Sequence, residues 1–299
     1  MRFAKGHGTE NDFVILLDPD GQQGLTGALA ARLCDRRAGI GGDGVLRVVR
    51  TAAMGEDGSA GAGAPGAAPA AEWFMDYRNA DGSVAEMCGN GIRVFARYLA
   101  EHGLADGKEF SVATRSGPRR VRLEAPGSAQ EGTEAGGPGA VDWVGGVTVD
   151  MGAVAVLGPG SAVIGGRSYE GLRISVGNPH LACLVDDPLA SFDLSRPPGL
   201  DPGQFPGGGN VELVRLTGPR SVVMRVHERG SGETRSCGTG AVAAAAAAAT
   251  ATGQHEGPWS VTVPGGELTV TLKAGRAWLT GPAVIVAEGD LDPAWLAAT

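Results

Sequence analysis

The sequence predicts a strand-rich fold made of two related halves, and two observations lead to this prediction. First, the motif Cys-Gly-x-Gly occurs at Cys88 and again at Cys237, 149 residues further along the chain. Identical residues recur at this offset without a gap: Met75 and Met224, Ser111-Val112 and Ser260-Val261, Gly117 and Gly266, Val121 and Val270, and Leu123 and Leu272. Second, short β-branched runs dominate the chain, while long amphipathic helical patterns are few. A matched repeat of this kind is typical of a duplicated unit.

The elements follow from local pattern. Short apolar and β-branched runs predict strands at Phe13 to Leu17, Val45 to Val49, Trp73 to Tyr77, Val147 to Asp150, Val211 to Leu216, Val222 to Val226, Val261 to Val263, Leu268 to Leu272 and Ala283 to Val286. One helix is expected after Cys88 and ends by Gly103, a second follows Cys237 and ends near Gly253, and a weaker pattern covers Gly27 to Arg36. Two stretches rich in small residues, Ala52 to Ala71 and Ala125 to Ala140, are expected to be loops.

Composition limits the class of protein. A length of 299 residues allows two domains, and a net charge of −8 with a pI of about 5.2 argues against nucleic acid as a partner. No signal peptide or membrane-spanning run is visible, and the four cysteines do not form a disulfide scaffold. There is no CxxC or HExxH motif, so no metal site is expected. A cytoplasmic enzyme is the expected class.

The two cysteines are the strongest candidates for chemistry. Each lies at the expected N-terminus of a helix, where free backbone N–H groups and the helix dipole should stabilise a thiolate and lower the pKa. The neighbouring glycines leave these N–H groups open to a carboxylate. The polar segments from Asn79 to Ser83 and from Glu228 to Thr234 each begin nine residues before a cysteine but differ in chemistry, as an asymmetric substrate would require. Two buried structural cysteines are the alternative.

These motifs also carry a family resemblance. Asn79-Ala80-Asp81-Gly82-Ser83 followed by Cys88-Gly89-Asn90-Gly91-Ile92-Arg93 is similar to the signature of diaminopimelate epimerase. The resemblance extends to the segments from His7 to Phe13, from Gly177 to His180, and from Glu228 through Cys237 to Ala241. It implies an α+β fold of two pseudo-symmetric halves, each a curved antiparallel sheet or barrel around a central helix, with the active site in the cleft between them. The expected halves are 1–118, completed by 283–299, and 119–282.

The resemblance assigns roles. Cys88 and Cys237 would be the catalytic acid and base, with His180 paired to Cys88 and Glu228 to Cys237. The substrate would be bound by Asn11, Asn79, Asn178, Asn210, Glu228 and Arg229, and by the backbone of Gly89, Asn90, Gly238 and Thr239. Two departures are visible. Many family members have glutamine where this chain has Gly44, and the two stretches rich in small residues are not part of the family's core pattern. A homodimer is expected.

The implied reaction is the epimerisation of LL-2,6-diaminopimelate to the meso form. No cofactor motif is present to act as an electron sink, so the two cysteines would transfer the proton by themselves, one from each face. Three alternatives stay open. A dithiol oxidoreductase lacks a resolving CxxC. A nucleotide-binding enzyme would use Gly238 to Ala243, but no strand is expected before that segment. Another cofactor-independent racemase would share the cysteines and differ in the residues that bind the distal end of the substrate.

Overall fold

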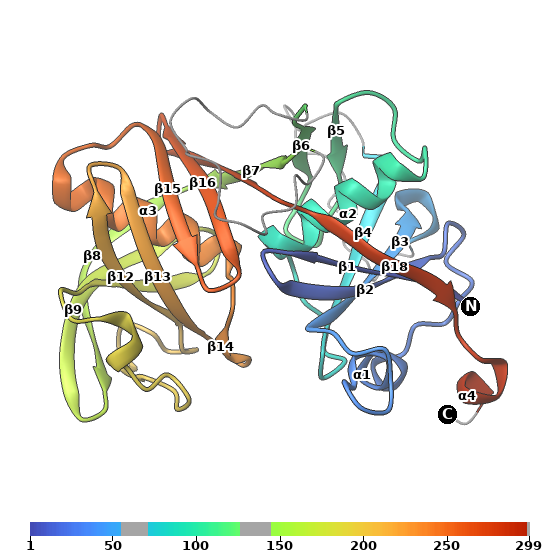
Figure 1. Ribbon diagram of the computed structural model, residues 1–299, viewed down its shortest axis with the longest axis horizontal. Helices are drawn as coiled ribbons and strands as arrows, with labels where there is room; N and C mark the ends of the chain where they lie inside the picture. Colours follow the sequence, from blue (N-terminus) through green and yellow to red (C-terminus); the bar gives the residue numbers. More distant parts are fainter. Residues whose placement is uncertain (55–70, 126–144, 298–299) are drawn as a thin grey trace, which may run out of the picture.

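The computed structural model describes residues 1–54, 71–125 and 145–297 (Figure 1). The elements before the second undescribed segment are β1 (Arg2–Gly8), β2 (Asn11–Leu17), α1 (Gly27–Cys34), β3 (Gly44–Arg50), η1 (Thr51–Ala53), β4 (Trp73–Asn79), α2 (Gly89–Glu101), β5 (Glu109–Val112) and β6 (Arg119–Leu123). Those after it are β7 (Val147–Ala153), β8 (Ala155–Ile164), β9 (Arg167–Ser175), β10 (Pro179–Leu184), η2 (Leu189–Ser191), β11 (Gly199–Leu200), β12 (Asn210–Gly218), β13 (Ser221–Glu228), β14 (Gly232–Thr234), α3 (Gly238–Thr252), β15 (Gly257–Val263), β16 (Gly266–Lys273), β17 (Arg276–Gly281), β18 (Val284–Asp290) and α4 (Pro293–Ala297).

The strands form two sheets. One has the order β18-β1-β2-β3-β4, and the other follows the path β11-β8-β9-β10-β12-β13-β15-β16-β17-β7-β6-β5, with β14 paired to β13. Most pairs are antiparallel, but β2 and β3, β10 and β12, and β13 and β15 are parallel. The fold class predicted from the sequence, α+β, is therefore confirmed, although its sheets are not purely antiparallel. In Figure 1, β18 crosses from the second half of the chain and lies beside β1, with which it pairs.

The sequence repeat is also a structural repeat. With the offset of 149 residues, β4 corresponds to β13 and α2 to α3. Even the strand contacts match: the parallel bridge between Phe74 and Ala113 has its counterpart in the pairing of Val223 with Thr262. Likewise the antiparallel bridge from Arg78 to Val84 corresponds to the pairing of His227 with Glu233. The inferred duplication is thus confirmed in three dimensions.

The two repeated helices are enclosed by strands (Figure 1). Residues Gly89–Leu99 of α2 and Gly238–Ala249 of α3 are all buried, so neither helix has a solvent-facing stripe. A helix that is buried on every side belongs to the centre of its domain. The run from Ala243 to Ala249 suits this position in α3, because small side chains let the surrounding strands approach the helix backbone.

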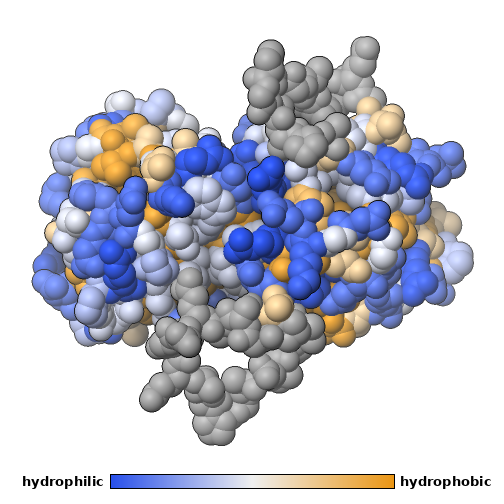
Figure 2. Space-filling view, turned by 90° about the horizontal axis from the view of Figure 1, so that it is seen from above, coloured by the Kyte–Doolittle hydropathy of each residue, from blue (hydrophilic) through white to orange (hydrophobic). Residues whose placement is uncertain are grey.

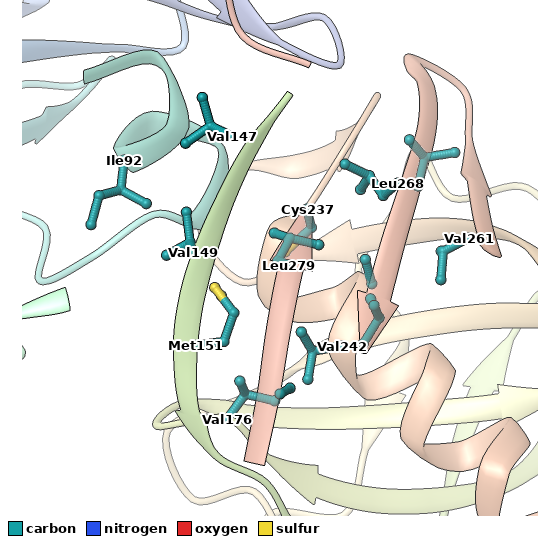
Figure 3. Packing of buried hydrophobic residues seen from close by; sticks show 14 of the residues in the cluster. Ile92, Val147, Val149, Met151, Val176, Cys237, Val242, Val261, Leu268 and Leu279 are labelled. Carbon is teal, nitrogen blue, oxygen red and sulfur yellow. The ribbon is translucent and has the colours of Figure 1, made fainter. Parts of the chain in front are cut away.

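One hydrophobic core joins the two helices. Figure 3 shows Ile92 of α2 and Val242 of α3 on either side of β7 and β17, with Val149 and Leu279 between them. All four side chains are fully buried. Since the same core packs against both central helices, their relative position is set by close packing rather than by a flexible linker.

The nine predicted strands all overlap observed ones, and the three predicted helices are present. The helix after Cys237 ends at Gly253, which takes the left-handed conformation with φ of 70°. The strands of the described residues that were not predicted are β1, β5, β6, β8, β9, β10, β11, β14 and β17. In β8, Gly158-Pro159-Gly160 interrupts the pattern that identifies a strand. Most of the two expected loops, at Ala52 to Ala71 and Ala125 to Ala140, lies outside the described residues.

The surface in Figure 2 is largely hydrophilic over both halves, and hydrophobic residues lie in several separate areas. Within the described ranges, no helix has the length and apolar character needed to cross a membrane.

Candidate active site

The two cysteines cap the two central helices in the same way. Cys88 precedes α2 with φ of −137° and ψ of 123°, and Cys237 precedes α3 with φ of −128° and ψ of 119°. Each sulfur accepts a hydrogen bond from the backbone N–H three residues later, at 3.4 Å from Gly91 and 3.3 Å from Gly240. The thiols thus take the N-cap role that serine or threonine usually fills.

The first turns of the two helices touch each other through glycine. A Cβ atom added to Gly238 would lie 2.9 Å from the Cα of Gly89, and one added to Gly89 would lie 3.2 Å from the Cα of Gly238. Only residues without a side chain allow this approach. The free N–H groups and the positive ends of both helix dipoles therefore converge on one place between the cysteines, which is a site suited to a carboxylate.

A cavity of about 660 Å³ opens at this meeting point. It is lined by twelve of the predicted site residues, namely Asn11, Asn79, Cys88, Gly89, Asn90, Asn178, Asn210, Glu228, Arg229, Cys237, Gly238 and Thr239. These residues come from five separate parts of the sequence, and the fold brings them together around one cavity. His180 is the one predicted residue that does not line the cavity.

The pKa of each thiol moves in the direction opposite to the one expected from its position at a helix N-terminus. Burial raises the pKa of Cys88 to about 11, and the hydrogen bond from Gly91 only partly offsets this. The pKa of Cys237 is raised well above its ordinary value, first by burial and then by the carboxylates of Glu228 and Glu212. The prediction of lowered pKa values was wrong because desolvation outweighs the helix dipole in a buried site. The guanidinium of Arg93 favours the thiolate at Cys88, so Cys88 has the more favourable surroundings for a negative charge.

Asn11 is held in one orientation beside Cys88. Its amide nitrogen donates to Asp43 at 2.7 Å, which leaves its oxygen 3.6 Å from the sulfur of Cys88. The same oxygen accepts from the Asn90 amide at 3.1 Å. Asp43 is in turn bound by Arg36 at 2.7 Å. Sequence reasoning missed Asp43, although it directly precedes the noted Gly44.

Hydrogen bonds also join the two halves beside the cysteines. The Asn90 amide, at the start of α2, donates to the backbone oxygen of Ser236 at 3.0 Å. The Ser236 hydroxyl lies 2.6 Å from that of Thr9, which accepts from Arg93 at 3.2 Å. All four residues are buried. The side chain of Asn90 therefore links the segment before Cys237 to the helix that begins after Cys88.

His180 forms a buried pair with Glu212, which sequence reasoning missed. The ring Nδ1 lies 2.7 Å from Glu212 Oε1, and Nε2 lies 3.0 Å from the side-chain oxygen of Asn178. Both His180 and Glu212 are fully buried. Neither cysteine is among these hydrogen-bond partners, so the pairing of His180 with Cys88 stays a prediction. The signal for Glu212 was a carboxylate between the apolar residues Val211 and Leu213 of a predicted strand.

Glu228 lies beside Cys237. Burial raises the pKa of the Glu228 carboxyl, while hydrogen bonds from Thr234 and Cys237 stabilise its charged form. A carboxyl whose pKa is raised by burial and that is hydrogen-bonded to a thiol can exchange a proton with it. Its role in catalysis stays a prediction.

Further amide groups and a guanidinium line the same cavity. Asn210 accepts from the backbone N–H of Arg229 at 2.9 Å, Asn178 donates to Thr239 at 3.4 Å, and Asn79 donates to Ser83 at 3.0 Å. The exposed Arg229 side chain donates to a backbone carbonyl at 3.2 Å, and no carboxylate of the described residues forms an ion pair with it. These groups offer a ligand several amides and, at Arg229, a guanidinium that forms no ion pair with the described residues.

Solved structures of several proteins share this fold. A hydroxyproline epimerase from Agrobacterium vitis, solved with bound trans-4-OH-L-proline, superposes with a TM-score of 0.61 at 13% identity and covers 97% of this chain and 91% of that chain. A PhzF-family phenazine biosynthesis protein from Bacillus anthracis gives a TM-score of 0.66 at 15% identity, covering 97% and 98%. At these identities the likeness concerns the fold alone.

Sequence comparison is more specific. The family described as Diaminopimelate epimerase matches residues 3–141 and 172–286. The diaminopimelate epimerase of Thermobifida fusca is 58% identical, over 97% of this chain and 98% of its own length. That of Mycolicibacterium smegmatis is 51% identical, over 99% and 98%. The chain belongs to the diaminopimelate epimerase family.

Proposed function

We propose that the chain interconverts LL-2,6-diaminopimelate and meso-2,6-diaminopimelate, a step that leads to lysine. The observation that supports this most strongly is the meeting of two cysteine-capped helices at Gly89 and Gly238 inside one cavity. A carboxylate bound to both helix N-termini places its α-carbon between two sulfurs that approach from opposite sides. Family membership supplies the identity of the substrate.

The reaction is a proton exchange at that α-carbon. The thiolate of one cysteine removes the α-proton from one face, and the thiol of the other cysteine donates a proton to the opposite face. Hydrogen bonds from the two helix N-termini stabilise the negative charge that develops on the carboxylate as the C–H bond breaks. Enclosure in the cavity excludes water from the reacting carbon. The two thiols have then exchanged protonation states, and the reverse reaction follows the same path.

The remaining residues hold the substrate and assist the thiols. Asn79, Asn178, Asn210 and Arg229 bind the non-reacting amino-acid end, since asparagine can both accept from an ammonium and donate to a carboxylate. Glu228 exchanges a proton with Cys237. His180 contacts Asn178 and so helps to position that amide in the cavity. To pair with Cys88, the His180 ring would have to give up its contact with Asn178 or with Glu212.

One assay tests this function. The enzyme is incubated in D₂O with LL-diaminopimelate, and in parallel with a panel of amino acids that have one stereocentre, and deuterium at the α-carbon is measured by mass spectrometry. We expect exchange and formation of the meso isomer with diaminopimelate only. Equal exchange with single-centre amino acids would replace the assignment by a broader racemase.

The Arg229 variants test the binding of the distal end. We expect Arg229→Met and Arg229→Lys to lose about 2–4 kcal/mol in kcat/KM, which is about thirty- to a thousand-fold, because remote binding energy positions the reacting centre. Lysine fails because it cannot form two parallel hydrogen bonds to a carboxylate. Arg167→Met, at an exposed arginine that pairs with Asp187 outside the cavity, is the control. Wild-type kcat/KM in both Arg229 variants would contradict the assignment.

The resemblance supports three further proposals. Residues 1–118 with 283–299 form one half and 119–282 the other, a division supported by the pairing of β18 with β1. The enzyme acts in the cytoplasm, where two catalytic thiols stay reduced. It is a homodimer, and sedimentation equilibrium should therefore give twice the chain mass of 30.2 kDa.

A further inference from the structure

Tyr77 is a cavity residue to which no role has been given above. It lies on β4 two residues before Asn79, so both side chains are on the same face of the strand. The side chain is only 8% exposed, and its ring packs edge-on against Phe13 at a centroid distance of 5.9 Å. The residue lines the cavity, yet none of the described residues forms a hydrogen bond with its hydroxyl. A phenol hydroxyl that is open to a cavity and that no protein group binds is available to hydrogen-bond a ligand.

The ring of Tyr77 occupies space that Gly44 leaves free. Gly44 pairs with Asn79 across β3 and β4, and a Cβ atom at position 44 would lie 2.6 Å from Cε2 of Tyr77. It would also lie 2.5 Å from the backbone oxygen of Arg78. No side chain at position 44 is therefore compatible with this ring and strand geometry. The glycine that replaces the family's frequent glutamine at position 44 is thus accompanied by the phenol of Tyr77 in the adjacent strand.

The repeat shows that this phenol belongs to one half only. At the offset of 149 residues, Tyr77 corresponds to Val226 of β13, which is buried and apolar. The flanking buried positions are conserved in character, since Met75 corresponds to Met224. A simple packing role would be met by an apolar residue in both halves. The polar atom is present on one side only, as expected for contact with a substrate whose two ends are bound differently.

We infer that Tyr77 is a substrate-binding residue whose hydroxyl hydrogen-bonds a polar head group of bound diaminopimelate in place of a side chain at position 44. This inference rests on the proposed function. The hydroxyl can donate to a carboxylate or accept from an ammonium. Burial keeps the pKa of Tyr77 well above its ordinary value, so the phenol stays neutral and retains its proton as a donor.

The kinetic test is Tyr77→Phe, which removes the hydroxyl and keeps the ring. We expect kcat/KM for diaminopimelate to fall about tenfold or more, because the lost hydrogen bond is to a charged group. The melting temperature should stay the same, since no protein group loses a partner. The chain has three tyrosines. Tyr98→Phe and Tyr169→Phe, at residues outside the cavity, are the matched controls and should keep wild-type kinetics.

A binding measurement makes the result independent of turnover. Enzyme labelled with ¹³C at the phenol carbon of tyrosine gives three signals, and the signal lost in Tyr77→Phe belongs to Tyr77. We expect diaminopimelate to shift this signal and to leave the other two in place.

The outcomes separate this inference from the function on which it rests. The inference is overturned if kcat/KM is unchanged in Tyr77→Phe, or if diaminopimelate does not shift the Tyr77 signal. In either case, turnover of diaminopimelate by the wild-type enzyme still supports the proposed function. If the wild-type enzyme does not turn over diaminopimelate, the proposed function is overturned. The role of Tyr77 in binding that substrate is then overturned too.

Discussion

Cys88→Ala and Cys237→Ala should each abolish epimerisation and leave the fold intact. A positioned proton-transfer group contributes about 10²–10⁴-fold to a rate, and here each face of the α-carbon has a single such group. Loss of either sulfur therefore stops epimerisation completely, because the reaction needs proton removal from one face and proton delivery to the other. Activity is measured by formation of the meso isomer, and the fold by circular dichroism and melting temperature.

The serine variants and the two other cysteines sharpen this experiment. Cys88→Ser and Cys237→Ser should retain slow deuterium exchange on one face, since a hydroxyl is a far weaker acid than a thiol. Cys34 and Cys183 are also buried but do not line the cavity, so Cys34→Ala and Cys183→Ala should keep activity. Full turnover in either Cys88→Ala or Cys237→Ala would exclude the two-base mechanism.

The contact between the two helix N-termini should be almost as sensitive. Alanine at position 238 would place its Cβ 2.9 Å from the Cα of Gly89, which is backbone and cannot rotate away. The helices must then separate, and the bound carboxylate loses its fit to both of them. Because a displacement of about 1 Å can cost about 10²-fold in rate, we expect Gly238→Ala to lose at least that much in kcat/KM.

The control for this variant is Gly24→Ala, because no atom lies within 4 Å of the added Cβ at Gly24. It should have wild-type kinetics. In Gly89→Ala the added Cβ would lie 3.0 Å from Cε of Met151 and 3.2 Å from the Cα of Gly238, so this variant should lose activity to a smaller extent. Normal activity in both Gly89→Ala and Gly238→Ala would show that the close approach is unnecessary for catalysis.

Much of this fold could be predicted because it is encoded twice. The repeat around Cys88 and Cys237 marked both central helices, and apolar runs marked most of the strands of the core. Nine of the described strands were not predicted, and in one of them, β8, glycine and proline hide the alternation that identifies a strand. β8 nevertheless pairs with β9 as a local hairpin across Gly165-Gly166, so the missed signal was the turn.

The site was less predictable where the effect depends on burial. The helix dipole at Cys88 follows from the sequence, but the depth at which the sulfur lies does not, so the pKa was assigned the wrong direction. Glu212 and Asp43 were missed for a similar reason. Each contacts a motif residue, His180 or Asn11, from a distant segment, and nothing in its own neighbourhood indicates that partner.

The contact of Gly89 with Gly238 has a consequence for how such a site can arise and change. Equivalent residues touch each other, as they do on the axis of a two-fold symmetric dimer. Two separate identical chains joined in this way would have to carry every change on both sides of the axis. In the fused chain each half can change alone, and the two halves do differ: Asn79 has Glu228 as its counterpart, and Tyr77 has Val226. Covalent fusion thus frees a symmetric catalytic centre to recognise a molecule with unlike ends.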